Sequence, residues 1–440
     1  MMSTHSSRDA ELKPSPGPTL PVTLATLKKL FPIRELQEEV LESFALDRRT
    51  ECYSAGAILA RRGELSDSVL YLLEGIALVD VGGQTGYQVE SGTTRSRFPL
   101  CGGDGNSVSV VALSDVQVLR VCAGIMAQSG VANDDATVAV DPYDPAFPVS
   151  LRTSRLFQAF CQNDGEGTGE ILPVPEVASR VRDIFGRKGG GAELGRLVAW
   201  DPILSAKLIG QANSPLYYPQ APITHFHDAV RRIGNKATQN LLVRCCVRKI
   251  AHFRRPEIHR RIRNWWQASV LRAAVCQVLA VEYSDLNPHE ARLAGLVADI
   301  GELPYLQFAD EFPANYWSPQ ELEQALPYVR PGLGAAVLNR WSFPGQLAAI
   351  PLLARSWHYD GGEQLTPADL VILANSLIAI GTPAQARQPA IDTLLAWGKL
   401  KGGGLTPQQA LQVLQKARAM LVQLGVADVG ASQDSSPHYH

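Results

Sequence analysis

The sequence DPILSAKLIGQANS at residues 201–214 decides the fold of the larger part of this 440-residue chain. The Asp201 side chain can cap the amino end of a helix, and Pro202 suits the first helical turn, where no backbone N–H is needed. Leu204 and Leu208 then recur at helical spacing. The stretch therefore predicts a helix that begins directly after Asp201.

The same start signals recur further along the chain. Ser318-Pro319 with Glu321 has the spacing of a capping box, and Thr366-Pro367 and Thr406-Pro407 repeat the pairing of a capping residue with a first-turn proline. The segments that follow carry apolar residues at helical intervals. We therefore predict that residues 171–425 form an all-helical bundle.

Residues 51–122 have a different pattern. Short apolar runs, such as 69–73 and 108–112, alternate with glycine turns such as Gly75 and Gly82-Gly83. Short runs at short intervals are typical of a β-barrel or jelly roll. The sequence thus predicts an α+β multidomain protein, with a β domain before the helical bundle.

The polar segments set the expected boundaries. Residues 1–20 and 426–440 are polar without apolar periodicity, so we predict that they are disordered. We place the β domain at residues 21–125 and a linker at 126–170, within which residues 154–160 have the pattern of a short helix. The helical bundle follows at 171–425.

Composition narrows the function classes. A formal net charge of -2 favours neither nucleic acid nor membrane as a partner. Seven cysteines without a C-x-x-C pair indicate free thiols in a reducing compartment. The sequence begins without a signal-peptide pattern and has no long apolar run, so we expect a cytoplasmic location.

The helical part resembles the HDOD domain, a bacterial signalling-output domain related to the HD phosphohydrolases. Its matching segments, in the family's order, are LPVP at 172–175, DPILSAKL at 201–208, ANS at 212–214, AVRRIG at 229–234, LAGL at 293–296 with IG at 300–301, and GAAVL at 334–338. The resemblance implies an all-helical fold that acts by binding other signalling proteins.

The resemblance also locates the positions where HD hydrolases hold their metal ligands. HD enzymes bind divalent cations through His and Asp on facing helices, and the cations activate water. The corresponding positions here are Ala268, Ala298, Asp299, Arg330, His358 and Asn375. Only Asp299 and His358 could bind a cation, whereas a catalytic zinc-type site needs about three protein ligands. We therefore expect no metal, no cofactor and no catalysis, with Arg330 pairing with Asp299 in place of the ion.

The β domain resembles the cyclic nucleotide-binding domain. The resemblance rests on YSAGAIL at 53–59, RGE at 62–64 and YLLEG at 71–75. In that family an arginine holds the cyclic phosphate, but Asn106 occupies its place here. A neutral amide cannot replace the charged, bidentate contact of a guanidinium. We expect a degenerate structural or dimerisation module; the alternative is a sensor that binds a cyclic nucleotide or dinucleotide through Arg95 and Arg97.

A basic stretch lies between residues 229 and 256, which contain no acidic residue. It is either a solvated helix face or a docking patch for an acidic protein, a dinucleotide or nucleic acid. The residues proposed for docking are Arg248, Lys249, Arg254 and Arg255. The His227-Asp228 dipeptide nearby lacks the sequence context of an HD dyad, so we interpret Asp228 as a first-turn helix residue.

These features together predict a non-catalytic regulator of bacterial signal transduction. Its expected partners are signalling proteins; membranes and nucleic acid are not expected, and a homo-oligomer is left open. Two alternatives remain at this point: a ligand-gated sensor that binds a cyclic nucleotide or dinucleotide, and a residual metal-dependent phosphodiesterase.

Overall fold

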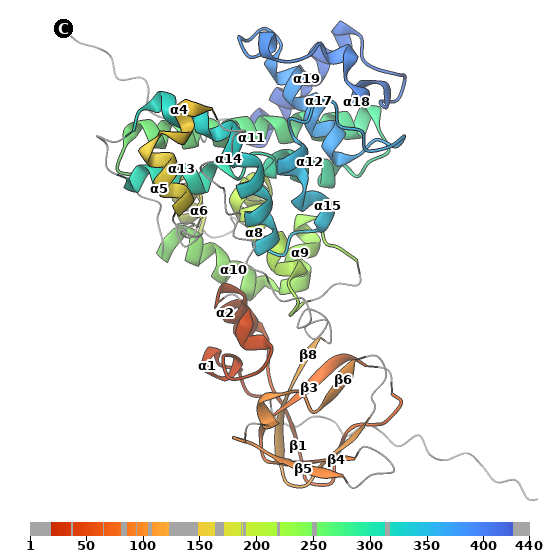
Figure 1. The fold of residues 1–440 in the computed structure, drawn as a ribbon. Coiled ribbons are helices and arrows are strands. Elements are labelled where there is room, and N and C mark those ends of the chain that lie inside the picture. The colour runs from red at the N-terminus through yellow and green to blue at the C-terminus, as the bar shows by residue number, and fades with distance from the viewer. Residues whose placement is uncertain are drawn as a thin grey trace, which may run out of the picture. The chain divides into compact units, whose positions relative to one another are not determined.

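The computed structural model describes residues 19–425 except for 37, 65, 81–85, 94, 104–107, 123–147, 163–170, 186, 188–190, 218–220, 249–252 and 313–316 (Figure 1). The chain divides into two compact units. The N-terminal unit comprises residues 1–132 with 214–218, and the helical unit comprises 133–213 with 219–440. The disorder predicted for both termini falls, apart from residues 19 and 20, outside the described residues.

The N-terminal unit is built on two four-stranded antiparallel sheets. The first has the order β1 (Glu51–Tyr53), β8 (Val116–Cys122), β3 (Ser66–Glu74), β6 (Cys101–Gly103). The second has the order β2 (Ile58–Ala60), β7 (Ser109–Ala112), β4 (Ile76–Asp80), β5 (Tyr87–Glu90). The strand prediction for residues 51–122 is confirmed, but a closed barrel is wrong, because each sheet ends in its own edge strands.

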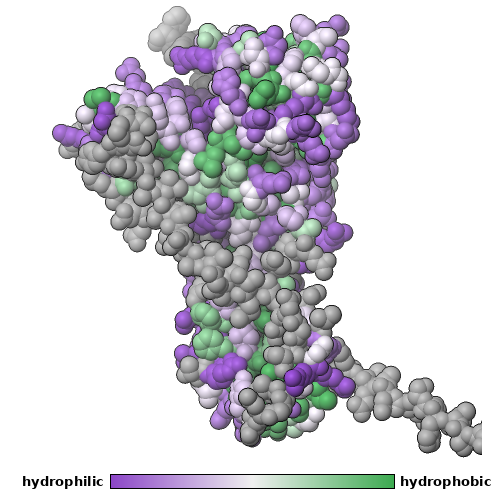
Figure 2. All heavy atoms as spheres, turned by 45° about the vertical axis from the view of Figure 1, so that its right-hand side comes forward, coloured by the Kyte–Doolittle hydropathy of each residue, from purple (hydrophilic) through white to green (hydrophobic). Residues whose placement is uncertain are grey.

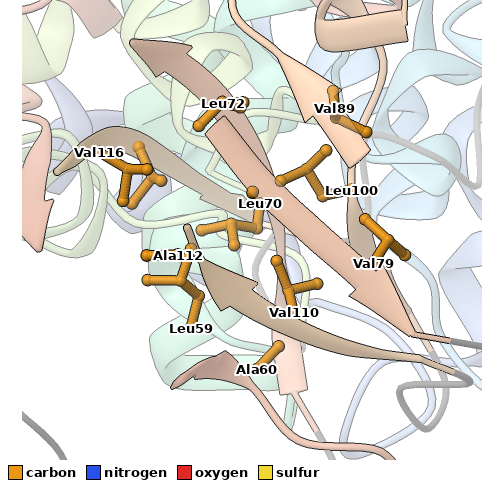
Figure 3. Close-up of a cluster of buried hydrophobic side chains, with 12 residues drawn as sticks. Leu59, Ala60, Leu70, Leu72, Val79, Val89, Leu100, Val110, Ala112 and Val116 are labelled. Atoms are coloured by element: carbon orange, nitrogen blue, oxygen red, sulfur yellow. The ribbon is translucent and has the colours of Figure 1, made fainter. Parts of the chain in front are cut away.

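The core of this unit consists of apolar side chains from both sheets. Leu70 and Leu72 alternate along β3, and Val79 and Val110 face each other in the register of β4 and β7. Figure 3 shows these side chains gathered in one cluster. Burial of one such side chain stabilises the fold by about 1.5–3 kcal/mol. Gly75 turns β3 into β4 with a φ of 89°, a conformation that favours glycine.

Four short helical segments complete the described N-terminal unit. They are α1 (Leu24–Leu27), η1 (Ile33–Glu35), α2 (Glu38–Asp47) and η2 (Arg95–Arg97). Three of them, α1, η1 and α2, precede the first strand. The segment η2 lies between β5 and β6 and carries the two arginines proposed as ligand contacts.

The helical unit is helical throughout its regular structure in the described residues. Its elements are α4 (Val149–Arg152), α5 (Arg155–Gln162), α6 (Pro175–Phe185), α7 (Gly191–Trp200), α8 (Pro202–Asn213), α9 (Phe226–Ile233), α10 (Asn235–Val243), the π-helix η3 (Arg244–Arg248), α11 (Pro256–Tyr283), α12 (Pro288–Val297), α13 (Glu302–Glu311), α14 (Pro319–Arg340), α15 (Gly345–Ala348), α16 (Ile350–Leu353), α17 (Pro367–Ala379), η5 (Gln385–Arg387), η6 (Ile391–Thr393), α18 (Leu395–Gly398) and α19 (Pro407–Gln423). On the face in Figure 2, hydrophilic and hydrophobic residues are interspersed over its described surface.

The decisive stretch forms α8, as predicted. The Asp201 Oδ1 accepts hydrogen bonds from the backbone N–H groups of Ile203 (3.1 Å) and Leu204 (2.7 Å). The other carboxylate oxygen accepts from the Trp266 indole N–H at 2.9 Å, so the cap also fastens α8 to α11. Every residue from Pro202 to Ala212 is buried. Such a helix belongs in the centre of a domain.

Part of the predicted linker at 126–170 is helical and belongs to the helical unit. Two helices, α4 and α5, pack against α14 and α13 respectively. The ring of Phe160 lies edge-on to Tyr305 (4.9 Å between centroids) and Phe308 (5.4 Å). Leu156 and Phe157 are also buried, so the apolar face of the amphipathic α5 is packed against the helical unit.

Glycines allow the helices around α11 to approach closely. This 28-residue helix packs against α8, α12, α13, α17 and α19. A Cβ at Gly295 of α12 would lie 2.7 Å from the Cα of Ala273. A Cβ at Gly301 would clash with the backbone of Arg330 and Gly334 on α14. These contacts hold the turn between α12 and α13 against both α11 and α14.

Candidate functional site

The turn between α12 and α13 presents Asp299, the acidic residue that the sequence resemblance assigns to the HD dyad position. Asp299 is buried, with 4% of its surface exposed, and its backbone carbonyl accepts a 2.8 Å hydrogen bond from the Trp265 indole. Ala298, which stands beside it, is fully buried. The dyad position is thus part of the domain interior.

Three arginines surround the Asp299 carboxylate. Arg272 of α11 and Arg355, which follows α16, donate hydrogen bonds to it. The second Arg355 amino group donates to Oδ2 at 3.0 Å, and Arg330 of α14 places Nε 3.4 Å from Oδ1. One carboxylate therefore binds guanidinium groups from three separate elements.

The electrostatics favour the ionised carboxylate. Burial by itself raises the pKa of Asp299, but the charges of Arg272, Arg355 and Arg330 outweigh it and hold the pKa well below its ordinary value. Burial in turn lowers the pKa of Arg272, and the charge of Asp299 opposes that shift. The side chains of the three arginines are 4%, 38% and 11% exposed for Arg272, Arg355 and Arg330.

Two more side chains satisfy the remaining donors. Glu302 accepts from Arg330 at 2.8 Å and pairs with Arg261 at 3.2 Å. The Asn375 Oδ1 accepts from Arg272 Nε at 2.7 Å, while its Nδ2 donates to the Ala354 carbonyl at 2.8 Å. We call this network the Asp299 cluster: Asp299, Glu302, Arg272, Arg330, Arg355 and Asn375.

The structure brings together some of the positions identified from the sequence and separates others. Arg330 and Asn375 meet at Asp299, and the pairing of Arg330 with Asp299 is present. Ala268 lies on the exposed face of α11, and the α11 residue that reaches the carboxylate is Arg272, four positions further on. His358 is exposed and is not among the contacts of Asp299.

The cluster is poorly suited to hold a cation. A guanidinium donates hydrogen bonds and has no lone pair to offer a metal. Both Asp299 oxygens already face guanidinium groups. Within the described residues, no three His, Cys, Asp or Glu side chains are grouped so that they could hold a metal ion.

The two arginines proposed as ligand contacts in the N-terminal unit differ in their surroundings. Arg95 donates to the Pro99 carbonyl at 3.0 Å and to the Tyr87 hydroxyl at 3.1 Å, and it also stacks on the Tyr87 ring. Arg97 is exposed. Asn106 lies outside the described residues. Both side chains are exposed, and Arg95 is held within its own loop by these contacts.

The residues proposed for partner docking also differ from one another in their exposure. Arg254 is exposed. Arg255 is half-buried: its guanidinium lies 4.9 Å from the centre of the Trp317 ring and donates to the Phe312 carbonyl. The Arg248 side chain and Lys249 fall outside the described residues. Arg255 is thus a structural residue at the start of α11, contrary to the exposed position expected for it.

The sequence model of the HDOD domain family matches residues 171–354. Residues 171–354 therefore form an HDOD domain, as the motifs indicated. Two residues of the Asp299 cluster, Arg355 and Asn375, come from the helical segment that follows this match. The cluster is completed by a part of the chain that the family pattern does not include.

Several solved structures are similar to this chain. The MmoQ response regulator of Methylococcus capsulatus is 19% identical over 56% of this chain and 99% of its own, with a TM-score of 0.43. An HDOD domain protein of Geobacter sulfurreducens is 19% identical over 62% and 97%, with a TM-score of 0.30. A signal transduction protein of Marinobacter aquaeolei is 18% identical over 73% and 74%, with a TM-score of 0.32.

No curated protein matches the chain. Among the described helices, none is both long and apolar enough to span a bilayer.

Proposed function

We propose that this chain is a non-catalytic signal-transduction protein whose HDOD domain acts by binding protein partners. The observation that carries the proposal is the Asp299 cluster. Where an HD hydrolase holds a divalent cation, this chain directs three guanidinium groups at one carboxylate. The positive charge that the carboxylate needs is supplied by the chain itself.

A residual phosphodiesterase is disfavoured by the same geometry. A cation at Asp299 would have to displace Arg272, which is buried, and would then lie beside Arg330. Like charges at such short range repel strongly in a medium of low dielectric constant. The second ligand expected from the sequence, His358, is exposed and outside the cluster.

The hydrolase alternative has a direct test. The chain is incubated with Mn²⁺ or Mg²⁺ and either a cyclic dinucleotide or a simple aryl phosphodiester. We expect no turnover beyond that of an Asp299→Asn variant, which serves as the blank. Turnover that depends on the metal and disappears in Asp299→Asn would refute the non-catalytic proposal.

We further propose that an acidic protein surface docks on the exposed basic residues of the helical unit, which include Arg254, Arg231 and Lys236. Electrostatic complementarity of this kind raises the association rate and makes binding sensitive to salt. The proteins captured by the native chain are compared with those captured by two variants. One is Arg254→Glu, and the other is Arg418→Glu, a control that makes the same charge change on α19. Selective loss in Arg254→Glu is expected; equal capture by all three would exclude this surface.

For the N-terminal unit we propose a cyclic nucleotide-binding-like jelly roll that has lost its ligand. The support is the strand order, in which consecutive strands, apart from β4 and β5, lie in opposite sheets. Arg95 donates to Pro99 and Tyr87, so part of its hydrogen-bonding capacity is already used within its own loop.

Thermal shift measurements with cyclic AMP, cyclic GMP and a cyclic dinucleotide test this proposal. A ligand at about 100 times its dissociation constant adds about 2.7 kcal/mol of stability, which is readily detected. We expect no shift with any of the three. A saturable shift that Arg97→Ala abolishes would instead support the ligand-gated sensor.

A further inference from the structure

Three histidines meet where α9 and α12 begin. His225 is the N-cap of α9, and its Nδ1 accepts a 3.0 Å hydrogen bond from the backbone N–H of His227. The His225 ring lies perpendicular to the His289 ring of α12, with 4.1 Å between centroids, and 5.2 Å from the His227 ring. The His227-Asp228 pair of the sequence therefore belongs to this histidine cluster.

The hydrogen bonding requires a neutral imidazole at His225. A protonated His225 Nδ1 could not accept from the backbone, so protonation would remove the cap of α9. The Nδ1 of His289 is buried and has no hydrogen-bond partner among the described residues. A proton added to this nitrogen would bring a buried positive charge that has no hydrogen-bond acceptor among the described residues.

The local charges also oppose protonation. The amino ends of two helices, α9 and α12, meet here, and each carries the positive end of a helix dipole. Arg292 of α12 is largely buried over the Trp200 ring, 5.1 Å from its centre. Asp228, whose charge favours protonation of both His225 and His289, is half-exposed and pairs with Arg231 at 2.9 Å.

Several other charged groups lie on α12 and on the helices packed against α9 and α12. Glu290, beside His289, is half-buried, and Lys236 of α10 is exposed. Lys207 of α8 lies over the Trp341 ring, Arg272 of α11 pairs with Asp299, and Asp369 of α17 pairs with Lys399.

Together these effects fix the direction of the pH response. Burial, followed by the charge of its neighbour His227, lowers the pKa of His225; burial, followed by His225, lowers that of His289. A histidine whose pKa is lowered by folding contributes its full stability when the pH is above its pKa in the unfolded chain, about 6.5. That stability is lost as the pH falls below this value.

We propose that the histidine cluster is an acid-sensitive contact: with His225 and His289 neutral at pH 7 it holds the start of α9 against α12, and it loosens in mild acid. The loop before α9 is fixed at its other end, because Asn213 exchanges two 2.8 Å hydrogen bonds with the backbone of Ile223. The loosening is therefore confined to the chain from residue 224 into the first turns of α9.

Hydrogen exchange of the full chain tests the proposal. Exchange of peptides within residues 221–233 is measured at pH 7.5 and 5.5 and corrected for the intrinsic rate. We expect a several-fold loss of protection at pH 5.5 in the native chain. The double variant His225→Asn, His289→Gln keeps a capping side chain and a polar group, and it should lose much less. The matched control is His358→Gln, an exposed histidine, which should behave like the native chain.

The proposal is overturned if the native chain keeps its protection at pH 5.5, or if the double variant loses as much as the native chain. If the double variant does not fold at pH 7.5, the ring protons of the native chain decide the question by NMR. Two of the nine histidines must then titrate below about pH 6.5. Titration of all nine at or above that pH would equally overturn it.

Discussion

Replacing Asp299 with asparagine removes the only formal charge that Arg272 contacts directly in the Asp299 cluster. The Arg272 side chain is 4% exposed and cannot turn to solvent, whereas Arg355 is 38% exposed and Arg330 keeps Glu302. The loss is therefore concentrated on one buried guanidinium. Removing one partner of a buried ion pair costs about 3–5 kcal/mol, and we expect a loss in that range.

Tryptophan fluorescence isolates the unit concerned, because all seven tryptophans, from Trp200 to Trp397, lie in the helical unit. One kcal/mol shifts the melting temperature of a unit of this size by about 2–4 °C, so Asp299→Asn should lower it by about 6–20 °C. The matched control is Asp285→Asn. Asp285 pairs with Lys401, and its side chain is 91% exposed. This substitution should cost about 1 kcal/mol or less.

The pH dependence gives a second check on this reasoning. The pKa of Asp299 lies well below its usual value, so its contribution is present above the unfolded pKa and is lost only in stronger acid. The stability difference between the native chain and Asp299→Asn should thus be constant between about pH 5.5 and 8. A cost no larger than that of Asp285→Asn would refute the structural role assigned to the cluster.

Two further substitutions test the packing. Gly210→Ala should destabilise the helical unit by about 1–3 kcal/mol, because its Cβ would clash with the Trp341 carbonyl, whereas Gly345→Ala, with open space around it, should be neutral in the same melting experiment. Arg255→Glu should cost about 1–3 kcal/mol in denaturant unfolding, since it loses its buried contacts, while exposed Arg254→Glu should stay within about 0.5 kcal/mol. Equal effects within either pair would contradict the packing described.

Local signals in the sequence predicted the helices well. The capping box at Ser318 is formed as predicted, Thr366 caps α17, and Asp201 caps α8. These features depend on residues within one turn of each other, so the sequence contains all the information needed. The short apolar strands of the N-terminal unit were equally readable, but the separation of the sheets depends on edge strands whose pairing is not local.

The Asp299 cluster was only half predictable. Arg330 could be identified because it replaces a ligand in a recognisable motif. Arg272 and Arg355 reach Asp299 from 27 and 56 residues away, and no local pattern marks a long side chain that points inward. Ala268 is exposed one turn before Arg272, and a shift of one turn along a long helix changes which side chain faces the cluster.

The position of Arg255 in the basic stretch was likewise misjudged, because its neighbours are distant in sequence. Arg255 packs on Trp317 and binds the Phe312 carbonyl, and its backbone N–H is held by the buried Asp310. A count of charges along the chain cannot separate such a residue from an exposed one like Arg254.

The metal content of the native chain decides between an arginine-filled cluster and a working cation site. The chain is produced with added manganese, iron and zinc, purified without chelators and analysed for each element beside Asp299→Asn. We expect the same trace level in both proteins, far below one ion per chain. About one or two ions per native chain, lost in Asp299→Asn, would show that Asp299 binds metal and that the arginines do not replace it.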